Sequence, residues 1–166
     1  MQKKINESIA ALSRDDFKKV VAATPLVSID LLVRDPQGRL LVGLRNNAPA
    51  QGFWFVPGGR IRRHESIDAA FSRLTKMELG HNFSRSSAHF FGLYDHFYDE
   101  DFSGDSSLGG THYVVLAHEI LVPSVEALLL PTDQHSTYRW LTDKQLWTDS
   151  LVHPNTRAYS KTHAGV

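Results

Sequence analysis

Hydrophobic and polar residues follow helical spacing in some segments of this chain and extended spacing in others, and turn signals separate the segments. Phe17, Val20 and Val21 lie at helical spacing behind a capping box at Ser13, which predicts a helix over residues 13–23. The same criteria predict helices over 66–79 and from 142 onward. They predict strands over 26–33, 40–44, 90–98, 112–121 and 138–140. A turn is predicted over 35–38, and a strand end at 54–56 runs into a glycine-rich turn at 57–59. No internal repeat occurs, so we predict one α+β domain over residues 1–166, with a core over about 13–160 and mobile ends, including the tail beyond Arg157.

The segment from Ser66 to Leu79 shows the strongest helical pattern, and Gly80 after it is typical of a helix C-terminus. At 100° per residue, one apolar face of this helix is formed by Ile67, Ala70, Phe71, Leu74 and Met77. Glu78 falls inside that face, where a desolvated carboxylate needs a cation or hydrogen bonds. Arg73 lies at its edge. Two interpretations are open for both charges: a structural ion pair, or a metal at Glu78 with a phosphate at Arg73.

The composition excludes several classes of protein. The chain has 166 residues, of which 42% are hydrophobic and 22% charged, as expected for one folded domain and not for a disordered or fibrous chain. Its 18 basic and 18 acidic residues argue against a sequence-independent hold on nucleic acid or an anionic membrane. Cysteine is absent, which excludes disulfides, thiolate catalysis and Cys-ligated metals. Because we find neither a secretory signal nor a long apolar stretch, we expect a soluble cytoplasmic protein.

Charge is balanced over the whole chain but separated locally. Residues 39–64 contain five arginines and no carboxylate, whereas residues 95–105 contain five carboxylates and no lysine or arginine. A segment rich in arginine suits bidentate contact with phosphate oxygens, although a solvated surface would show the same pattern.

A set of spaced residues resembles the Nudix signature, G-x5-E-x7-R-E-U-x-E-E-x-G-U, in which U is apolar. The matches in spacing are Gly59, Glu65, Arg73, Glu78 and Gly80. We expect Glu65 to support the turn before the helix without touching a metal.

The chain departs from that signature at several positions. Leu74 and Met77 replace glutamates that normally help to hold divalent ions or activate water, and His81 replaces the last apolar residue. The departures, together with further segments, resemble the GDP-mannose mannosyl hydrolase branch of Nudix proteins over about residues 13–160. These further segments are Leu26–Asp30, Pro57–Arg60, His96–Asp99, Thr111–Val115 and Asp133–His135.

The resemblance implies a Nudix α/β/α sandwich with a central mixed sheet, and hydrolysis of GDP-mannose, or of GDP-glucose, to GDP and the free sugar. Water would attack the anomeric carbon with inversion, as in an inverting glycosidase, instead of attacking phosphorus. One Mg²⁺ ion for each active site, with Mn²⁺ as an alternative, would neutralise the departing diphosphate. The resemblance also implies a homodimer.

A helix that keeps one inward carboxylate cannot hold Mg²⁺ alone, because the ion takes six oxygens at about 2.0–2.1 Å. By resemblance, the other protein ligands beside Glu78 are the carbonyl of Gly58 and the side chain of Gln134. Water and the substrate phosphates would complete the set. His135, next to Gln134, is the implied general base, a role that suits a histidine near neutral pH.

The remaining implied roles surround the substrate. Arg45 and Arg60 would stabilise the leaving GDP, and Arg73 and Tyr113 would contact its diphosphate. Asp30 and His96 would lie near the sugar. Phe17 would stack on the guanine base across a dimer interface. From the residues alone, Asp30 could equally cap a strand end, and Tyr113 and Phe17 could be core residues.

Two other functions are consistent with the same residues. One is a conventional Nudix pyrophosphohydrolase that cleaves a nucleoside diphosphate derivative at phosphorus. The other is a nucleotide-sugar sensor that binds without turnover. Isotope labelling in ¹⁸O-water separates attack at carbon from attack at phosphorus, and nucleotide binding without product in the presence of Mg²⁺ would indicate a sensor.

Overall fold

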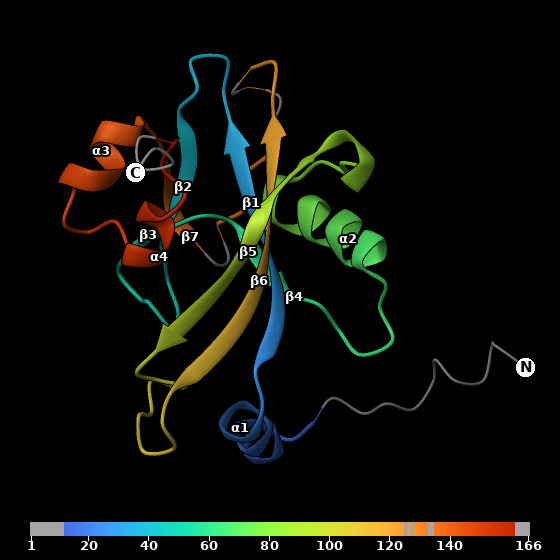
Figure 1. The fold of residues 1–166 in the computed structure, drawn as a ribbon, viewed down its shortest axis with the longest axis vertical. Coiled ribbons are helices and arrows are strands. Elements are labelled where there is room, and N and C mark those ends of the chain that lie inside the picture. Colours follow the sequence, from blue (N-terminus) through green and yellow to red (C-terminus); the bar gives the residue numbers. More distant parts are fainter. Residues whose placement is uncertain (1–11, 125, 127, 133–134, 162–166) are drawn as a thin grey trace, which may run out of the picture.

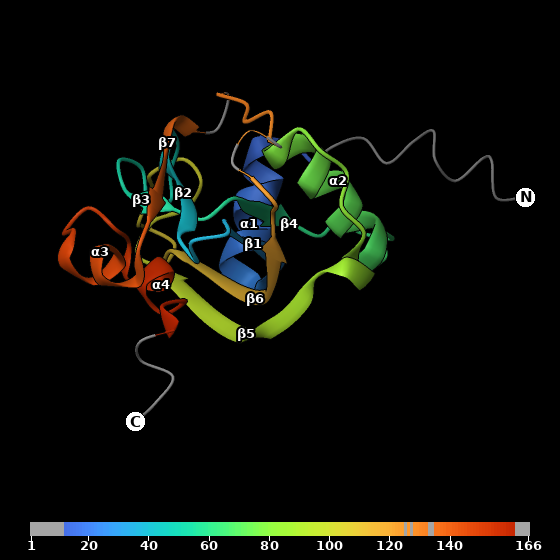
Figure 2. The same ribbon diagram turned by 90° about the horizontal axis from the view of Figure 1, so that it is seen from above.

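The computed structural model describes residues 12–161 apart from 125, 127, 133 and 134, and in this part of the chain a mixed sheet lies between helices (Figures 1 and 2). The helices are α1 (Arg14–Ala23), α2 (Ile67–Leu79), the short 3-10 helix η2 (Arg85–Ser87), α3 (Asp143–Thr148) and α4 (Pro154–Arg157). The strands are β1 (Leu26–Arg34), β2 (Leu40–Arg45), β3 (Trp54–Phe55), β4 (Gly58–Arg60), β5 (His89–Tyr98), β6 (Thr111–Leu121) and β7 (His135–Leu141).

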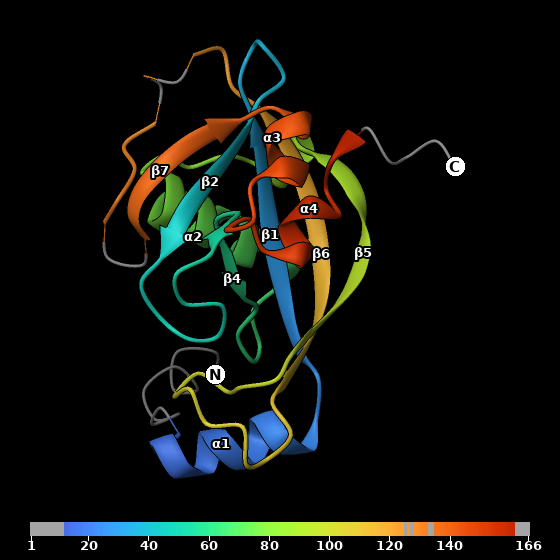
Figure 3. The same cartoon turned by 90° about the vertical axis from the view of Figure 1, so that its left-hand side faces the viewer.

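The sheet has the strand order β3-β2-β1-β6-β5, with β4 joined to β1 and β7 joined to β2. β1 runs parallel to β6, and the other pairs are antiparallel. β1 meets β2 at Arg34 and Leu40, and its N-terminal half pairs instead with β4. β1 and β2 therefore diverge from this point, with β4 between them (Figure 3). The mixed sheet with helices on both faces confirms the predicted α/β/α sandwich.

Side chains of β1 alternate between two hydrophobic clusters, one on each face of the sheet. Ile29, Leu31 and Val33 pack with Phe71 and Leu74 of α2, in what we call the α2-side core. Leu32 packs on the opposite face with residues from β3, α3 and the C-terminal segment, the α4-side core, which includes Trp54, Phe55, Leu146, Val152 and Tyr159. Each large apolar side chain buried in these clusters contributes about 1.5–3 kcal/mol. Asp30 shares the parity of Leu32 and therefore faces the α4-side core.

Helix α2 begins and ends as its sequence predicts. The side chain of Ser66 accepts a hydrogen bond from the amide of Ala69 at the N-terminus. Gly80 has a φ of 69° at the C-terminus, and a Cβ there would collide with the carbonyl oxygen of Leu129, so only glycine fits both requirements.

The buried face of α2 differs from the predicted one at its edges. Ile67 is 40% exposed and Met77 is 46% exposed, so placing them in the core was wrong. The buried face extends to Thr75 and Leu79 instead, which leaves Met77 outside it, whereas Ile67 is exposed as the first residue of the helix. The hydroxyl of Thr75 accepts a hydrogen bond from the loop amide of Phe83, so this polar group is satisfied in the interior. Glu78 is 3% exposed, which agrees with its predicted inward position.

Two other segments differ from their sequence predictions. Gly58–Arg60 forms strand β4 opposite Ser28–Asp30 and is not a turn, since Gly58 has no Cβ to collide with the carbonyl oxygen of Ile29. The expected mobile tail is wrong for Tyr159 and Ser160, which are buried behind α4. The other residues expected to be mobile, 1–11 and 162–166, lie outside the described part. No helix in the described part is both long and apolar enough to cross a bilayer.

Candidate active site

The carboxylate of Asp30 forms the centre of a buried polar group on the α4 side of the sheet. The hydroxyl of Tyr159 donates a hydrogen bond of 2.7 Å to Asp30 Oδ2 and lies 3.2 Å from His96 Nε2. Since the hydroxyl has one proton, the His96 contact requires Nε2 to be the donor. Burial raises the pKa of Asp30 to about 7, against the opposing effects of the Tyr159 hydrogen bond and the Arg45 charge. Burial also lowers the pKa of His96 to about 4, so its imidazole is neutral at pH 7.

Arg45 lies at the end of β2, where this strand has diverged from β1. Its guanidinium carbon is 5.7 Å from the ring centre of Phe55, and its buried Nε has no hydrogen-bond partner among the described residues. The β2–β7 register places Arg45 opposite His135, and the Arg45 charge favours the ionised form of Asp30. A buried guanidinium nitrogen of this kind is suited to an anionic ligand such as a diphosphate.

His135 is 1% exposed and lies between β2 and α2. Its Nδ1 is 4.0 Å from Glu78 Oε2, and its ring lies over Gly43, where a Cβ would collide with it. Nδ1 is also 3.5 Å from the hydroxyl of Tyr138, which donates its own proton to the carbonyl of Pro131 at 2.6 Å. These neighbours favour the tautomer with the proton on Nδ1, in which Nε2, buried without a hydrogen-bond partner in the described part, carries the lone pair.

Burial lowers the pKa of His135 to about 4, and the nearby positive charge of Arg45 adds to this effect. The expectation of a histidine that titrates near neutral pH is therefore replaced by one that is neutral at pH 7. A neutral imidazole with a free Nε2 can accept a proton from water.

The described residues provide few ligands for a divalent ion. No group of three or more histidine or acidic side chains among them is arranged to hold a metal, and Glu78 is the buried carboxylate of α2. Gly58 lies opposite Asp30, in a position that leaves no room for a Cβ, and Gln134 lies outside the described residues. This ligand set fits an ion held largely by substrate phosphates and does not fit one enclosed by protein.

Phe17, Arg60 and Tyr113 form a second group near α1. The guanidinium carbon of Arg60 is 4.2 Å from the ring centre of Phe17, and the ring of Phe17 also lies beside that of Phe102, with centres 4.9 Å apart. Burial raises the pKa of Tyr113, while the charges of Arg60 and Arg45 oppose this shift. The two arginines therefore act on the same tyrosine from different strands.

Arg73 is engaged in an ion pair. Its Nε and Nη2 donate to the two oxygens of Glu65 at 2.6 and 2.8 Å, and Nη2 also donates to the carbonyl of Arg60 at 2.9 Å. Glu65 accepts from the amide of Arg62 as well, so it supports the turn as expected. Of the two interpretations open for Arg73, this geometry favours the structural ion pair, which holds β4 against α2.

Sequence reasoning missed three residues at this site: Tyr159, Phe55 and His153. Tyr159 lies in a segment without periodic pattern, and its contact with Asp30 spans 129 positions. The ring of His153 lies 5.2 Å from that of Phe55, centre to centre. Its Nδ1 accepts a hydrogen bond from the backbone amide of Asn155 at the start of α4. The His-Pro pair before a short helix was the available signal for His153, since proline is common at the first helical position.

Comparisons with known proteins agree with this fold. The family model described as "NUDIX domain" matches residues 24–162. A curated relative, the low-salt glycan biosynthesis protein Agl8 of Haloferax volcanii, is 39% identical over 106 residues, which span 64% of this chain and 65% of that protein.

Two solved structures are similar to the chain. A MutT NUDIX hydrolase from Burkholderia pseudomallei has a TM-score of 0.64 at 26% identity, covering 81% of this chain and 95% of its own. The MutT protein from Methanosarcina mazei Go1 also has a TM-score of 0.64, at 17% identity, covering 84% of this chain and 94% of its own. With the family model matching most of its length, the chain belongs to the Nudix hydrolase family.

Proposed function

We propose that this chain hydrolyses GDP-mannose, or a related GDP-hexose such as GDP-glucose, to GDP and the free sugar. The observation that carries the proposal is that α2 buries one carboxylate, Glu78, beside a neutral histidine from β7. Leu74 packs in the core and Met77 is exposed at the positions where the Nudix signature has further glutamates. A site whose general base is His135 on β7, and not a glutamate on α2, can direct water to the anomeric carbon of the substrate instead of to phosphorus.

In the proposed reaction, His135 Nε2 accepts a proton from water as the water oxygen bonds to the anomeric carbon. The bond from that carbon to the diphosphate oxygen breaks, and its electron pair leaves with GDP. The Nδ1 proton of His135 faces the carboxylate of Glu78, which favours the imidazolium formed in this step. Attack on the side opposite the leaving group inverts the α-linked sugar to the β-anomer.

The other residues serve the two ends of the substrate. Arg45 and Arg60 stabilise the negative charge on departing GDP, and Tyr113 contacts the diphosphate. Asp30 and His96 contact the sugar, where an ionised carboxylate favours positive charge at the anomeric centre.

Phe17 stacks on guanine, and we include a homodimer and a cytoplasmic location in the proposal. The bidentate pair of Arg73 with Glu65 supports a positioning role for Arg73, in place of a direct contact with phosphate.

Glu78, the carbonyl of Gly58 and the side chain of Gln134 are the protein groups that would hold Mg²⁺. The ion, when bound, supplies charge neutralisation for the diphosphate leaving group. The name of the Haloferax relative, a glycan biosynthesis protein, supports a sugar-linked nucleotide as substrate.

The test is an assay of GDP-mannose and GDP-glucose with and without Mg²⁺, in which ¹H NMR follows the anomeric protons. The proposal predicts GDP and free sugar, with the β-anomer appearing first. Release of GMP and sugar 1-phosphate would instead establish a conventional pyrophosphohydrolase. Binding of GDP-mannose with no product would establish a sensor.

A further inference from the structure

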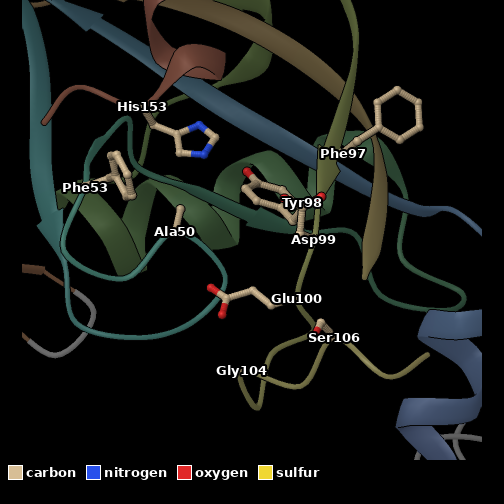
Figure 4. A pocket seen from close by; sticks show the side chains of 9 residues that line it. All are labelled: Ala50, Phe53, Phe97, Tyr98, Asp99, Glu100, Gly104, Ser106 and His153. Atoms are coloured by element: carbon tan, nitrogen blue, oxygen red, sulfur yellow. The ribbon is translucent and has the colours of Figure 1, made fainter. Parts of the chain in front are cut away.

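An open groove of about 360 Å³ lies between the loop over residues 46–53 and the loop over residues 99–110 (Figure 4). Neither loop contributes to the substrate contacts proposed above. The residues that give the groove its chemical character are Phe53, Tyr98, Glu100, Gly104, Ser106 and His153.

One wall of the groove is aromatic. The rings of Phe53 and His153 meet edge to face with centres 5.3 Å apart, and those of Tyr98 and His153 are 5.5 Å apart and tilted. Rings this close leave no slot between them for a planar base, so together they present a single apolar surface to the groove. Such a surface suits the C–H face of a pyranose.

The groove also has two acidic lining residues. Asp99 follows Tyr98 directly, and the carboxylate of Glu100 lies near Gly104 of the same loop (Figure 4). Among the described lining residues none is lysine or arginine, so the groove opposes phosphate and favours an uncharged ligand that donates hydrogen bonds. Sugar hydroxyls are donors of this kind.

The loop that supplies these acidic residues is held in place before any ligand binds. The buried carboxylate of Asp101 accepts hydrogen bonds from the amides of Ser103, at 2.6 Å, and Asp105, at 3.2 Å. Lys18 from α1 donates to Asp105 at 3.0 Å. A rim fixed in this way loses little conformational entropy on binding.

The groove adjoins the position proposed for the reacting sugar. The ring of Tyr98, which forms its inner wall, lies 6.4 Å from His96 and 6.0 Å from Tyr113, centre to centre. We propose that the groove is a second sugar subsite, which binds an uncharged pyranose next to the sugar unit attached to GDP. The inference rests on the proposed function for the identity of the adjacent site, and it extends the substrate class to GDP-linked sugars larger than one hexose.

The test is binding of methyl α-D-mannopyranoside and an α-linked mannobiose to the full chain, measured by saturation-transfer NMR and calorimetry with GDP and Mg²⁺ present. We expect millimolar affinity for the monosaccharide, tighter binding of the disaccharide, and no displacement by GDP. Glu100→Gln and Phe53→Leu should each weaken binding about 10-fold. The matched controls Asp15→Asn and Phe90→Leu, which lie away from the groove, should leave it unchanged.

The outcomes separate this inference from the proposed function. Binding lost in Asp30→Asn but kept in Glu100→Gln would assign the mannoside to the reacting-sugar position and overturn the second subsite. Displacement by guanosine, or no binding of either saccharide, would also overturn it. GDP-mannose hydrolysis, assayed on the same protein, tests the proposed function: its absence together with groove-dependent mannoside binding would contradict the proposed function alone.

Discussion

Replacing Tyr159 by phenylalanine removes one oxygen atom from the contact between the C-terminal segment and Asp30. The ring of Tyr159 is fully buried and would stay in place, so no cavity forms and the apolar packing is kept. What is lost is the 2.7 Å hydrogen bond to Asp30 Oδ2 and the contact with His96 Nε2.

A hydrogen bond to a charged acceptor contributes about 1.5–3 kcal/mol. Because the pKa of Asp30 is about 7, its carboxylate is only partly ionised at pH 7, and we place the loss at about 1–2 kcal/mol of folding free energy. The lost donor favours the charged form, so its removal raises the pKa of Asp30 further. With less of the carboxylate available at the sugar, we expect kcat/KM for GDP-mannose to fall by about 10-fold while the affinity for GDP is unchanged.

The assay combines urea unfolding, GDP-mannose turnover and GDP titration for Tyr159→Phe, Asp30→Asn and the double variant. Tyr94→Phe is the matched control, because its ring packs 4.9 Å from that of Tyr159 on the same face of the sheet. The cycle should give a coupling of about 1 kcal/mol or more between Tyr159 and Asp30. Coupling near zero, or equal turnover losses in Tyr159→Phe and Tyr94→Phe, would refute the positioning role.

Three other changes test separate parts of the site. His135→Gln should lower turnover by about 10² or more with GDP affinity largely kept, and unchanged turnover would remove His135 from the mechanism. Glu78→Gln should raise the Mg²⁺ concentration needed for half-maximal rate, whereas an unaltered Mg²⁺ dependence would exclude Glu78 as a ligand. Folding stability should fall between pH 6.5 and 4.5, because His96, His135 and His153 have folded-state pKa values of about 4 and each costs about 1.4 kcal/mol per pH unit as the unfolded chain takes up protons. The raised pKa of Asp30 acts in the opposite direction and offsets one of the three, so urea unfolding should show a net loss of about 2.8 kcal/mol per pH unit, and a flat profile would contradict the lowered histidine pKa values.

The sequence predicted the features of this fold that local rules determine. Periodicity identified α2, placed Glu78 on its inner face and marked Gly80 as the helix end, since each depends on residues within a few positions. The predicted buried face was wrong at Met77, because the angular position of that face depends on the elements packed against α2, and at Ile67, because it is the first residue of the helix.

Contacts between distant segments could not be predicted in the same way. His135 faces Arg45 through the register of β2 and β7, and that register is set by how the sheet assembles. Tyr159 reaches Asp30 from the segment that follows α4, a four-residue helix with too few positions to show periodicity. The lowered pKa of His135 has the same origin, since burial by surrounding elements cannot be read from one histidine.

The central claim is that a neutral buried histidine directs water to the anomeric carbon of a GDP-linked sugar. Hydrolysis of GDP-mannose in ¹⁸O-water with Mg²⁺, analysed by mass spectrometry of both products, tests it most directly. The account predicts one ¹⁸O atom in mannose and none in GDP. Label found in GMP or in mannose 1-phosphate would contradict it.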